Sequence, residues 1–253
     1  MDWDVNPSIS FETWLKALKD APESCIEVVA NQTRRDMGFA PQPIDIFAFA
    51  AERILSLWEE FRDSPVSRLT GASNITLEAV DNNLGLFGAS GVDSPTADPF
   101  DGILALHIRR GDYREHCTDT LWKDKLGFFG WNQLSYLPDR FTVAGDTTLE
   151  EFDKHCYPDD DAILKKIRDV KMRWEGGHGV GARQQLDTVF LMTNAGHAWQ
   201  EQMKRRLRDS GWSTVVTTQD LVLDAQQTEV SMAIDTELAR RAAVFIGNGV
   251  RFV

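Results

Sequence analysis

Apolar residues recur along the chain with two different periods, and the change between them falls near residue 101. Before that point they return every three or four positions, as they do on one face of an α-helix. The helices predicted in this part cover residues 10–21, 44–61 and 76–84. The second has so wide an apolar stripe that we expect it to be buried along much of its length.

After residue 101, short apolar runs alternate with helical patterns. The predicted strands are 103–108, 188–192, 213–217 and 243–247, and the predicted helices are 159–174, 198–209 and 228–242. Such alternation is typical of a parallel sheet with helices on its faces. We therefore predict an α/β protein with a mostly helical N-terminal region, 1–101, and a Rossmann-like domain, 102–253. The Gly- and Pro-rich segment 85–101 is interpreted as the linker between them.

Composition narrows the possible partners. The chain is 42% hydrophobic and 26% charged, which is ordinary for a soluble globular protein. Its net charge of −12 argues against a nucleic-acid partner and against an anionic membrane surface. The N-terminus lacks the pattern of a signal peptide, and no apolar run has the length of a membrane span. A small anionic ligand needs only local positive charge, so it remains compatible with this composition.

The three cysteines are Cys25, Cys117 and Cys156, and a histidine directly precedes each of the last two. A zinc site built from these two His-Cys pairs is one alternative. Zinc fingers separate their paired ligands by a few residues, whereas these pairs are contiguous, so we predict no metal. The other alternative is a disulfide between Cys117 and Cys156, which an oxidising compartment would favour.

Charged side chains appear at the point where the first predicted strand, 103–108, meets its loop. They are His107, Arg109, Arg110 and Asp112. Ligands of open α/β sheets bind beyond the carboxyl ends of the strands, and a guanidinium group binds phosphate oxygens two at a time. A diphosphate ligand is therefore one interpretation of the motif. The other is a strand-end salt bridge from Asp112 to one arginine, with His107 merely packed.

The motif His-x-Arg-Arg-x-Asp at 107–112 resembles the first signature of the GDP-fucose-dependent fucosyltransferases, the protein O-fucosyltransferase and α1,6-fucosyltransferase group. The segment 235–248, which starts with Asp235 and ends in Phe-Ile-Gly-Asn, is similar to a second signature of that family. A weaker third match is the run Val-Phe-Leu-Met-Thr-Asn at 189–194. The three matches occur in the family's order and cover roughly residues 100–250.

This resemblance implies a GT-B-like fold and an inverting, metal-independent transfer of fucose from GDP-fucose to a protein or glycan acceptor, without a cofactor. It assigns Arg109 to the charge that grows on the β-phosphate as GDP leaves, a task that a fixed guanidinium performs without metal. The other donor-binding residues that it implies are His107, Arg110, Asp112, Asp235 and Asn248. Glu115 is the candidate base for the acceptor hydroxyl. The family works in the secretory pathway.

Two departures from the family's pattern define an alternative function. The family continues after its Asn with small hydroxylated residues that begin a helix over the phosphates, whereas this chain reads Gly-Val-Arg-Phe-Val at 249–253. It also lacks a Gly-rich donor motif before residue 100. We therefore expect the sequence to be incomplete at both ends. The alternative is a truncated or degenerate protein that binds GDP-sugars without transferring them.

Two other functions are disfavoured by the sequence motifs, and one further segment has two possible interpretations. Adhesion through Arg-Gly-Asp at 110–112 is disfavoured, because that tripeptide directly follows a buried strand instead of occupying a loop tip. An NAD-dependent oxidoreductase is disfavoured because no G-x-G-x-x-G follows a predicted strand. The aromatic segment 114–161 has no clear period. It is either an acceptor-binding surface or a satellite hydrophobic cluster beneath a loop.

Overall fold

The computed structural model describes residues 7–25, 52–88, 98–123, 133–137, 139–176 and 185–247. The chain divides into two compact units. The first comprises Met1–Thr70, Gly127–Thr142 and Arg251–Val253, and the second comprises Gly71–Leu126 and Val143–Val250. No helix in these described ranges is long and apolar enough to span a membrane.

The second unit is built on a parallel sheet of four strands in the order β3-β2-β1-β4. The strands are β1 (Ile103–Ile108), β2 (Thr188–Thr193), β3 (Thr214–Thr217) and β4 (Val244–Gly247). The register places Ala105 of β1 beside Phe190 of β2 and Phe245 of β4. Each strand lies within one residue of its predicted position. The α/β class and the Rossmann-like parallel sheet are therefore confirmed.

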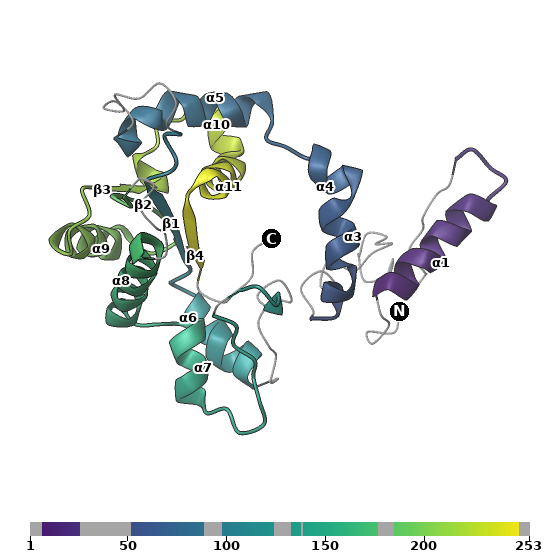
Figure 1. The fold of residues 1–253 in the computed structure, drawn as a ribbon, viewed down its shortest axis with the longest axis horizontal. Helices are drawn as coiled ribbons and strands as arrows, with labels where there is room; N and C mark the ends of the chain where they lie inside the picture. Colours follow the sequence, from purple (N-terminus) through teal and green to yellow (C-terminus); the bar gives the residue numbers. More distant parts are fainter. Residues whose placement is uncertain are drawn as a thin grey trace. The chain divides into compact units, whose positions relative to one another are not determined.

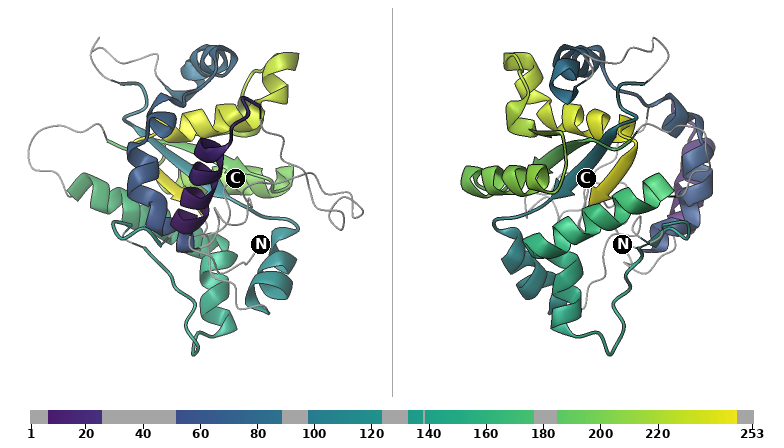
Figure 2. Two further views of the ribbon diagram at one scale, coloured as in Figure 1. Left: turned by 90° about the vertical axis from the view of Figure 1, so that its right-hand side faces the viewer. Right: turned by 60° about the vertical axis from the view of Figure 1, so that its left-hand side comes forward.

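One face of the sheet packs against α8 (Asp160–Gly176) and α9 (His197–Asp209), as Figures 1 and 2 show. The core on this face contains Leu104, Leu106 and Ile108 of β1, Ile163 and Ile167 of α8, and Met203 and Leu207 of α9. Both helices agree with the apolar periodicity of the sequence. Gly211, with a φ of +94°, adopts the left-handed conformation that commonly follows a helix end.

The opposite face packs against α5 (Asn74–Asn83) and α11 (Ser231–Arg241), and α10 (Ala225–Glu229) packs against these two helices (Figures 1 and 2). Its core contains Ile103 and Ala105 of β1, Ala79 and Val80 of α5, and Ile234 and Leu238 of α11. The helix predicted at 228–242 is therefore two helices, which separate at Val230. The first begins earlier than predicted because Asp224 and Gln227 form a capping box there.

The unit that holds the sheet begins at Gly71, before the boundary predicted between residues 101 and 102. The reason is that residues ahead of that boundary enter the core of the sheet. The 3₁₀-helix η3 (Leu84–Phe87) contributes Phe87, whose ring meets Phe190 edge-on with centroids 5.6 Å apart. Residues 85–88, which the sequence assigns to a linker, thus belong to the packed unit.

Between β1 and α8 the described residues form α6 (Tyr113–Glu115), the π-helix η5 (His116–Trp122) and α7 (Leu149–Cys156). A disulfide between Cys117 and Cys156 joins η5 to α7, and both residues are buried, whereas Cys25 is an exposed free thiol. Phe152 of α7 is fully buried, and its ring lies 5.6 Å from that of Trp122. For these residues the satellite hydrophobic cluster is the interpretation that fits.

The first unit contains α1 (Pro7–Asp20), η2 (Glu52–Leu57), α3 (Trp58–Asp63) and α4 (Pro65–Leu69). Of the helix predicted at 44–61, residues 44–51 lie outside the described residues. The remainder is a 3₁₀-helix that continues into α3, and Ser64 then caps α4 with Pro65 in its first turn.

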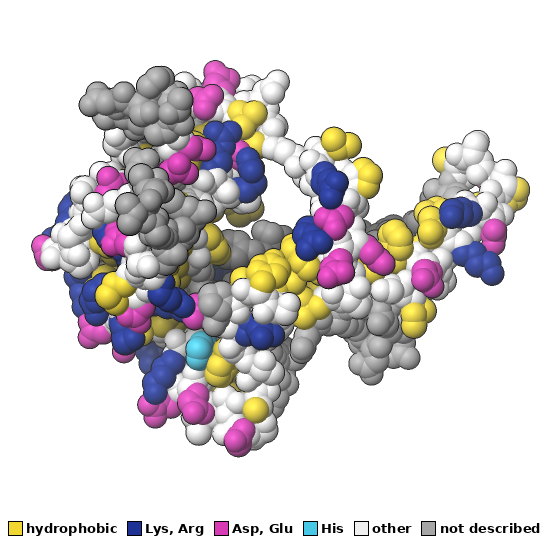
Figure 3. All heavy atoms as spheres, viewed as in Figure 1, with side chains coloured by type: hydrophobic (Ala, Val, Ile, Leu, Met, Phe, Trp, Pro, Cys, Tyr) yellow, Lys and Arg dark blue, Asp and Glu magenta, His cyan; other side chains and the backbone are white. Residues whose placement is uncertain are grey.

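The burial predicted for this helix is wrong in its second half. Ile54 is buried, with 3% of its surface exposed, but Phe61 is 43% exposed and α3 contains no buried residue. Figure 3 shows hydrophobic side chains on the surface of the first unit. Its exposed hydrophobic residues include Ile9, Phe11, Leu15, Val66 and Leu69. A wide apolar stripe shows that one face of a helix is hydrophobic. It does not identify the part of the protein that packs against that face.

Candidate functional site

Of the predicted site residues that the structure describes, His107, Arg109, Arg110 and Asp112 lie at or just after the carboxyl end of β1, and Asp235 lies on α11. His107 belongs to β1. Its side chain points to the same face of the sheet as that of Ala105, two residues earlier, and this face is the one that α5 and α11 cover. Arg109 and Arg110 follow the last residue of β1. Asn194, which directly follows β2, lies next to them and accepts the backbone N–H of Arg110.

Arg110 is held on the side of α8 and α9. It is only 6% exposed, and its Nη2 donates to Asp160 Oδ1 at 3.3 Å. The guanidinium carbon lies 4.5 Å from the ring centroid of Tyr157 and 5.1 Å from that of Trp199. Its backbone N–H donates to Asn194 Oδ1 at 2.7 Å. Arg110 is therefore fixed by an ion pair, two aromatic rings and its own main chain.

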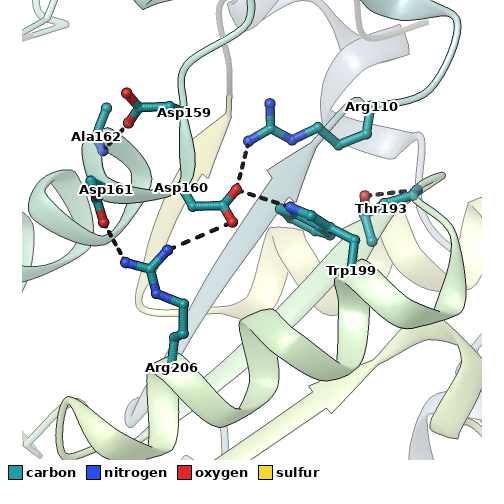
Figure 4. Close-up of polar contacts among 9 residues, drawn as sticks. Arg110, Asp159, Asp160, Asp161, Ala162, Thr193, Trp199 and Arg206 are labelled. Carbon is teal, nitrogen blue, oxygen red and sulfur yellow. Dashed lines mark hydrogen bonds and ion pairs between the residues drawn. The ribbon is translucent and has the colours of Figure 1, made fainter.

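Asp160, the first residue of α8, is the shared partner of several side chains around Arg110 (Figure 4). Besides Arg110, it accepts from Trp199 Nε1 at 2.9 Å and forms an ion pair with Arg206 Nη1 at 3.6 Å. Arg206 also pairs with Asp161. Three donors and the N-terminus of α8 thus stabilise one carboxylate whose side chain is 23% exposed.

Arg109 has a different environment from its neighbour. Its side chain is 47% exposed, and its ion pair with Asp112 spans 3.6 Å. Asp112 is itself 75% exposed and also accepts from Asn194 Nδ2 at 3.4 Å. Exposed pairs of this kind contribute little to stability. The strand-end salt bridge that the sequence offered as an alternative therefore exists for Arg109, and it leaves much of the guanidinium in contact with solvent.

Gly111 makes this arrangement of the two arginines possible. Its φ is +66°, which is in the left-handed region, and a Cβ there would lie 3.6 Å from Asn194 Nδ2. A glycine adopts this conformation at little cost, so the chain can turn sharply between Arg110 and Asp112. That turn sends Arg110 toward α8 and returns Asp112 to Arg109.

His107 is largely withdrawn from water. Burial, and to a lesser extent the positive charge of Arg109, lower the pKa of His107 to about 4. The imidazole is therefore neutral at pH 7. A neutral ring has one nitrogen that donates and one that accepts, which suits hydroxyl or phosphate groups of a ligand.

Asp235 lies on α11, beside the loop that leaves β3. Its Oδ2 accepts from Thr218 Oγ1 at 2.9 Å, while its buried Oδ1 has no hydrogen-bond partner within the part of the chain that the structure describes. Burial raises the pKa of this carboxyl to about 6, and the bond from Thr218 opposes that rise. An unsatisfied acceptor at this edge is suited to a donor group on a ligand.

The raised pKa predicts a pH-dependent effect of Asp235→Asn. Because the folded protein binds this proton more tightly than the unfolded chain, native stability is lost as pH rises from about 4 to about 6. Asparagine remains neutral and can still accept from Thr218. We expect the variant to raise the free energy of unfolding by about 2–3 kcal/mol at pH 8 and to match wild type below about pH 4.

Urea unfolding of both proteins across this pH range measures the difference. Asp81→Asn, which removes an exposed carboxylate from α5, is the matched control and should show no such pH dependence. A constant difference between Asp235→Asn and wild type at both ends of the range would contradict the prediction.

The structure brings together only some of the predicted residues. Arg109 and Asp112 are joined through their ion pair, while Arg110 faces α8 and α9 on the opposite side of the sheet from His107. Glu115 is exposed on α6, and its side chain makes no hydrogen bond or ion pair with any described residue. Asn248 lies outside the described residues.

Other residues of the edge were not predicted as site residues: Tyr157, Asp160, Asn194, Trp199 and Arg206. Asn194 had a usable signal, because it directly follows a buried strand, as Arg109 does. Tyr157 and Asp160 lie in or next to the aromatic segment without clear period, so nothing local distinguished them.

A cavity of about 640 Å³ opens beside this cluster. Its lining comprises Arg110, Gly111, Arg114, Tyr157, Asp159, Asp160, Asp161, Ala195, Gly196, Trp199 and Arg206. Among the described residues, no group of three or more His, Cys, Asp or Glu side chains has a geometry that could hold a metal ion.

Comparisons of the chain with protein-family models, with curated proteins and with solved structures found no match in any of the three.

Proposed function

We propose that this chain binds GDP-fucose at the carboxyl edge of its sheet and forms the nucleotide-sugar-binding part of a GT-B-like, inverting, metal-independent fucosyltransferase. The observation that carries the proposal is the contrast between the two adjacent arginines. Arg110 is immobilised by Asp160 and two rings, whereas Arg109 is half exposed at the carboxyl end of a central parallel strand. A guanidinium in that position suits the diphosphate of a nucleotide sugar.

Breaking the bond between fucose and GDP develops negative charge on the β-phosphate oxygen and positive charge on the sugar. In the proposed site Arg109 stabilises the departing diphosphate, and no metal is required for that step. Neutral His107 donates to the donor sugar or its phosphates, and the unsatisfied Oδ1 of Asp235 accepts from the nucleotide. Asp112 holds Arg109 in position through their ion pair.

The compartment and the acceptor follow from the same proposal. A buried disulfide between Cys117 and Cys156 is typical of proteins from an oxidising environment, which supports a place in the secretory pathway. The acceptor would be a protein or glycan hydroxyl, as in the family that the motifs resemble. Glu115 would remove its proton.

A second candidate is a protein that binds the GDP-sugar without transferring it. One observation favours it: Glu115 is exposed and no described residue orients its carboxylate. A general base must be held within hydrogen-bond reach of the acceptor proton, and acceptor binding would have to supply that order. The two candidates share the donor site and differ only in turnover.

Calorimetric titration of the full chain with GDP, GDP-fucose and UDP tests the donor site that both candidates require. We expect GDP and GDP-fucose to bind and UDP to bind more weakly. We also expect Arg109→Ala to weaken GDP binding, whereas Arg205→Ala, an exposed arginine on α9, should leave it unchanged. The absence of GDP binding at millimolar concentration, or equal binding of GDP and UDP, would contradict the proposal.

A further inference from the structure

The cavity of about 640 Å³ lies on the side of the sheet that α8 and α9 cover. His107 and Asp235, which the proposed donor site uses, belong to the other side, with α5 and α11. The volume is within the range of small-molecule sites and exceeds what a single inorganic ion needs. The proposed function gives this cavity no role.

The carboxylates of the cavity are already engaged. Asp160 accepts from Arg110 and Trp199 and pairs with Arg206 (Figure 4). Asp161 pairs with the same Arg206, and Asp159 Oδ1 accepts the backbone N–H of Ala162, which caps the start of α8. The negative charges of the lining therefore have partners within the protein.

The positive groups of the lining are not all engaged. Arg110 has a side chain only 7% exposed, and its Nε is buried without a hydrogen-bond partner among the described residues. Arg114 is exposed, and its guanidinium pairs with no carboxylate in the described part of the chain. Its guanidinium carbon lies 5.9 Å from the ring centroid of Tyr157. Two guanidinium groups thus have hydrogen-bond capacity left over at one cavity.

The N-terminus of α9 borders the same cavity. Gly196 is the N-cap of this helix of 13 residues, and it provides no side-chain hydrogen bond to the first turn. Ala195 and Gly196 both line the cavity. The first N–H groups of a helix have no acceptor within the helix, and the helix dipole adds positive potential there. An oxyanion at this position would supply the acceptor that the glycine cannot.

We propose that this cavity is a binding site, separate from the donor site, for an organic ligand that carries a phosphate or carboxylate group. The anionic group accepts from Arg114, from the remaining donors of Arg110 and from the first turn of α9. The rest of the ligand occupies the volume beside Tyr157 and Trp199. The ion pairs of Asp160 hold Arg110 in place before the ligand arrives, so little side-chain freedom is lost on binding.

Titrations of the full chain at low ionic strength test the site, with inorganic phosphate, glucose 6-phosphate and glucuronate as anionic probes and glucose as the neutral one. We expect the three anions to bind, glucose not to bind, and affinity to fall as salt is added. Glucose 6-phosphate bound more tightly than glucuronate would identify a phosphate ester as the source of the anion, and the reverse order would identify a carboxylate. Binding of glucose as tight as that of the anions would overturn the proposal.

Two substitutions test the geometry. Arg114→Gln removes one charge-assisted contact and should weaken binding of glucose 6-phosphate about tenfold, while Arg205→Gln, an exposed arginine elsewhere on α9, should change nothing. Gly196→Asp should abolish binding and raise the melting temperature, because its own carboxylate would cap α9. A Cβ at Gly196 meets nothing within 4 Å, so Gly196→Ala is the control that keeps the site open.

The outcomes separate this site from the donor site. We expect Arg109→Ala to retain the binding of glucose 6-phosphate that Arg114→Gln weakens, and Arg114→Gln to retain whatever GDP binding wild type shows. If Arg109→Ala alone abolished binding of glucose 6-phosphate, or if Gly196→Asp bound it as wild type does, the proposal would be wrong. Failure of GDP to bind, with the anion site intact, would remove only the proposed function.

Discussion

Asp160→Ala is expected to lower the free energy of unfolding by about 3–5 kcal/mol, the largest effect on stability among the substitutions considered. The variant leaves the guanidinium of Arg110, whose side chain is 7% exposed, without its only carboxylate among the described residues. Trp199 Nε1 loses its acceptor at the same time. A buried charge without a partner is costly, because desolvation is no longer offset by attraction.

Asp161→Ala is the matched control for this prediction. Asp161 is adjacent in sequence, lies in the same first turn of α8 and pairs with Arg206, but its side chain is 86% exposed. We expect it to lower stability by at most about 1 kcal/mol. Urea unfolding of the three proteins at pH 7 gives both differences. Equal losses for the two variants would show that Arg110 does not depend on Asp160.

Arg109→Ala is expected to lower the rate of fucose transfer by about 10²–10³-fold, equivalent to about 3–4 kcal/mol, with a much smaller change in GDP-fucose affinity. This prediction rests on the proposed function. Charge on the departing diphosphate grows toward the transition state, so a contact to that charge acts mainly on turnover. Arg109→Lys should restore little activity, because an ammonium cannot provide the two-point geometry of a guanidinium.

The measurement is transfer from GDP-fucose to a panel of protein and glycan acceptors, by wild type and each variant. Arg205→Ala controls for the loss of an exposed arginine from the same unit. Unchanged transfer in Arg109→Ala would remove the assignment of Arg109. If wild type binds GDP-fucose but transfers to no acceptor, the binding-only candidate is favoured.

The two arginines show how adjacent residues acquire different tasks. Arg109 and Arg110 are chemically identical in the sequence, and both were predicted to bind the donor. In the structure Gly111 allows a sharp turn, with a φ of +66°, and the side chains diverge from it. One arginine pairs loosely with Asp112, three residues away, and the other is held by Asp160, fifty residues away. In the proposed function, the exposed Arg109 is the one assigned to the departing phosphate.

The sequence by itself determined the elements of the sheet. Strands such as β1 and β2 consist largely of consecutive apolar residues, and α8 and α9 have an apolar residue every three or four positions, so their character depends on a few neighbouring residues. The order of residues also places charged side chains directly after β1. Because parallel strands end at the same edge, the sequence placed the motif at the carboxyl edge of the sheet.

Only the tertiary structure decided what surrounds that motif. The partners of Arg110 are Asn194, 84 positions away, and Asp160, 50 positions away, and no local pattern encodes such pairings. The unit boundary at Gly71 likewise depends on Phe87 reaching Phe190 across the core. Which distant residues meet depends on the spatial order of the strands in the sheet and on the direction in which each side chain points. Those two properties exist only once the chain has folded.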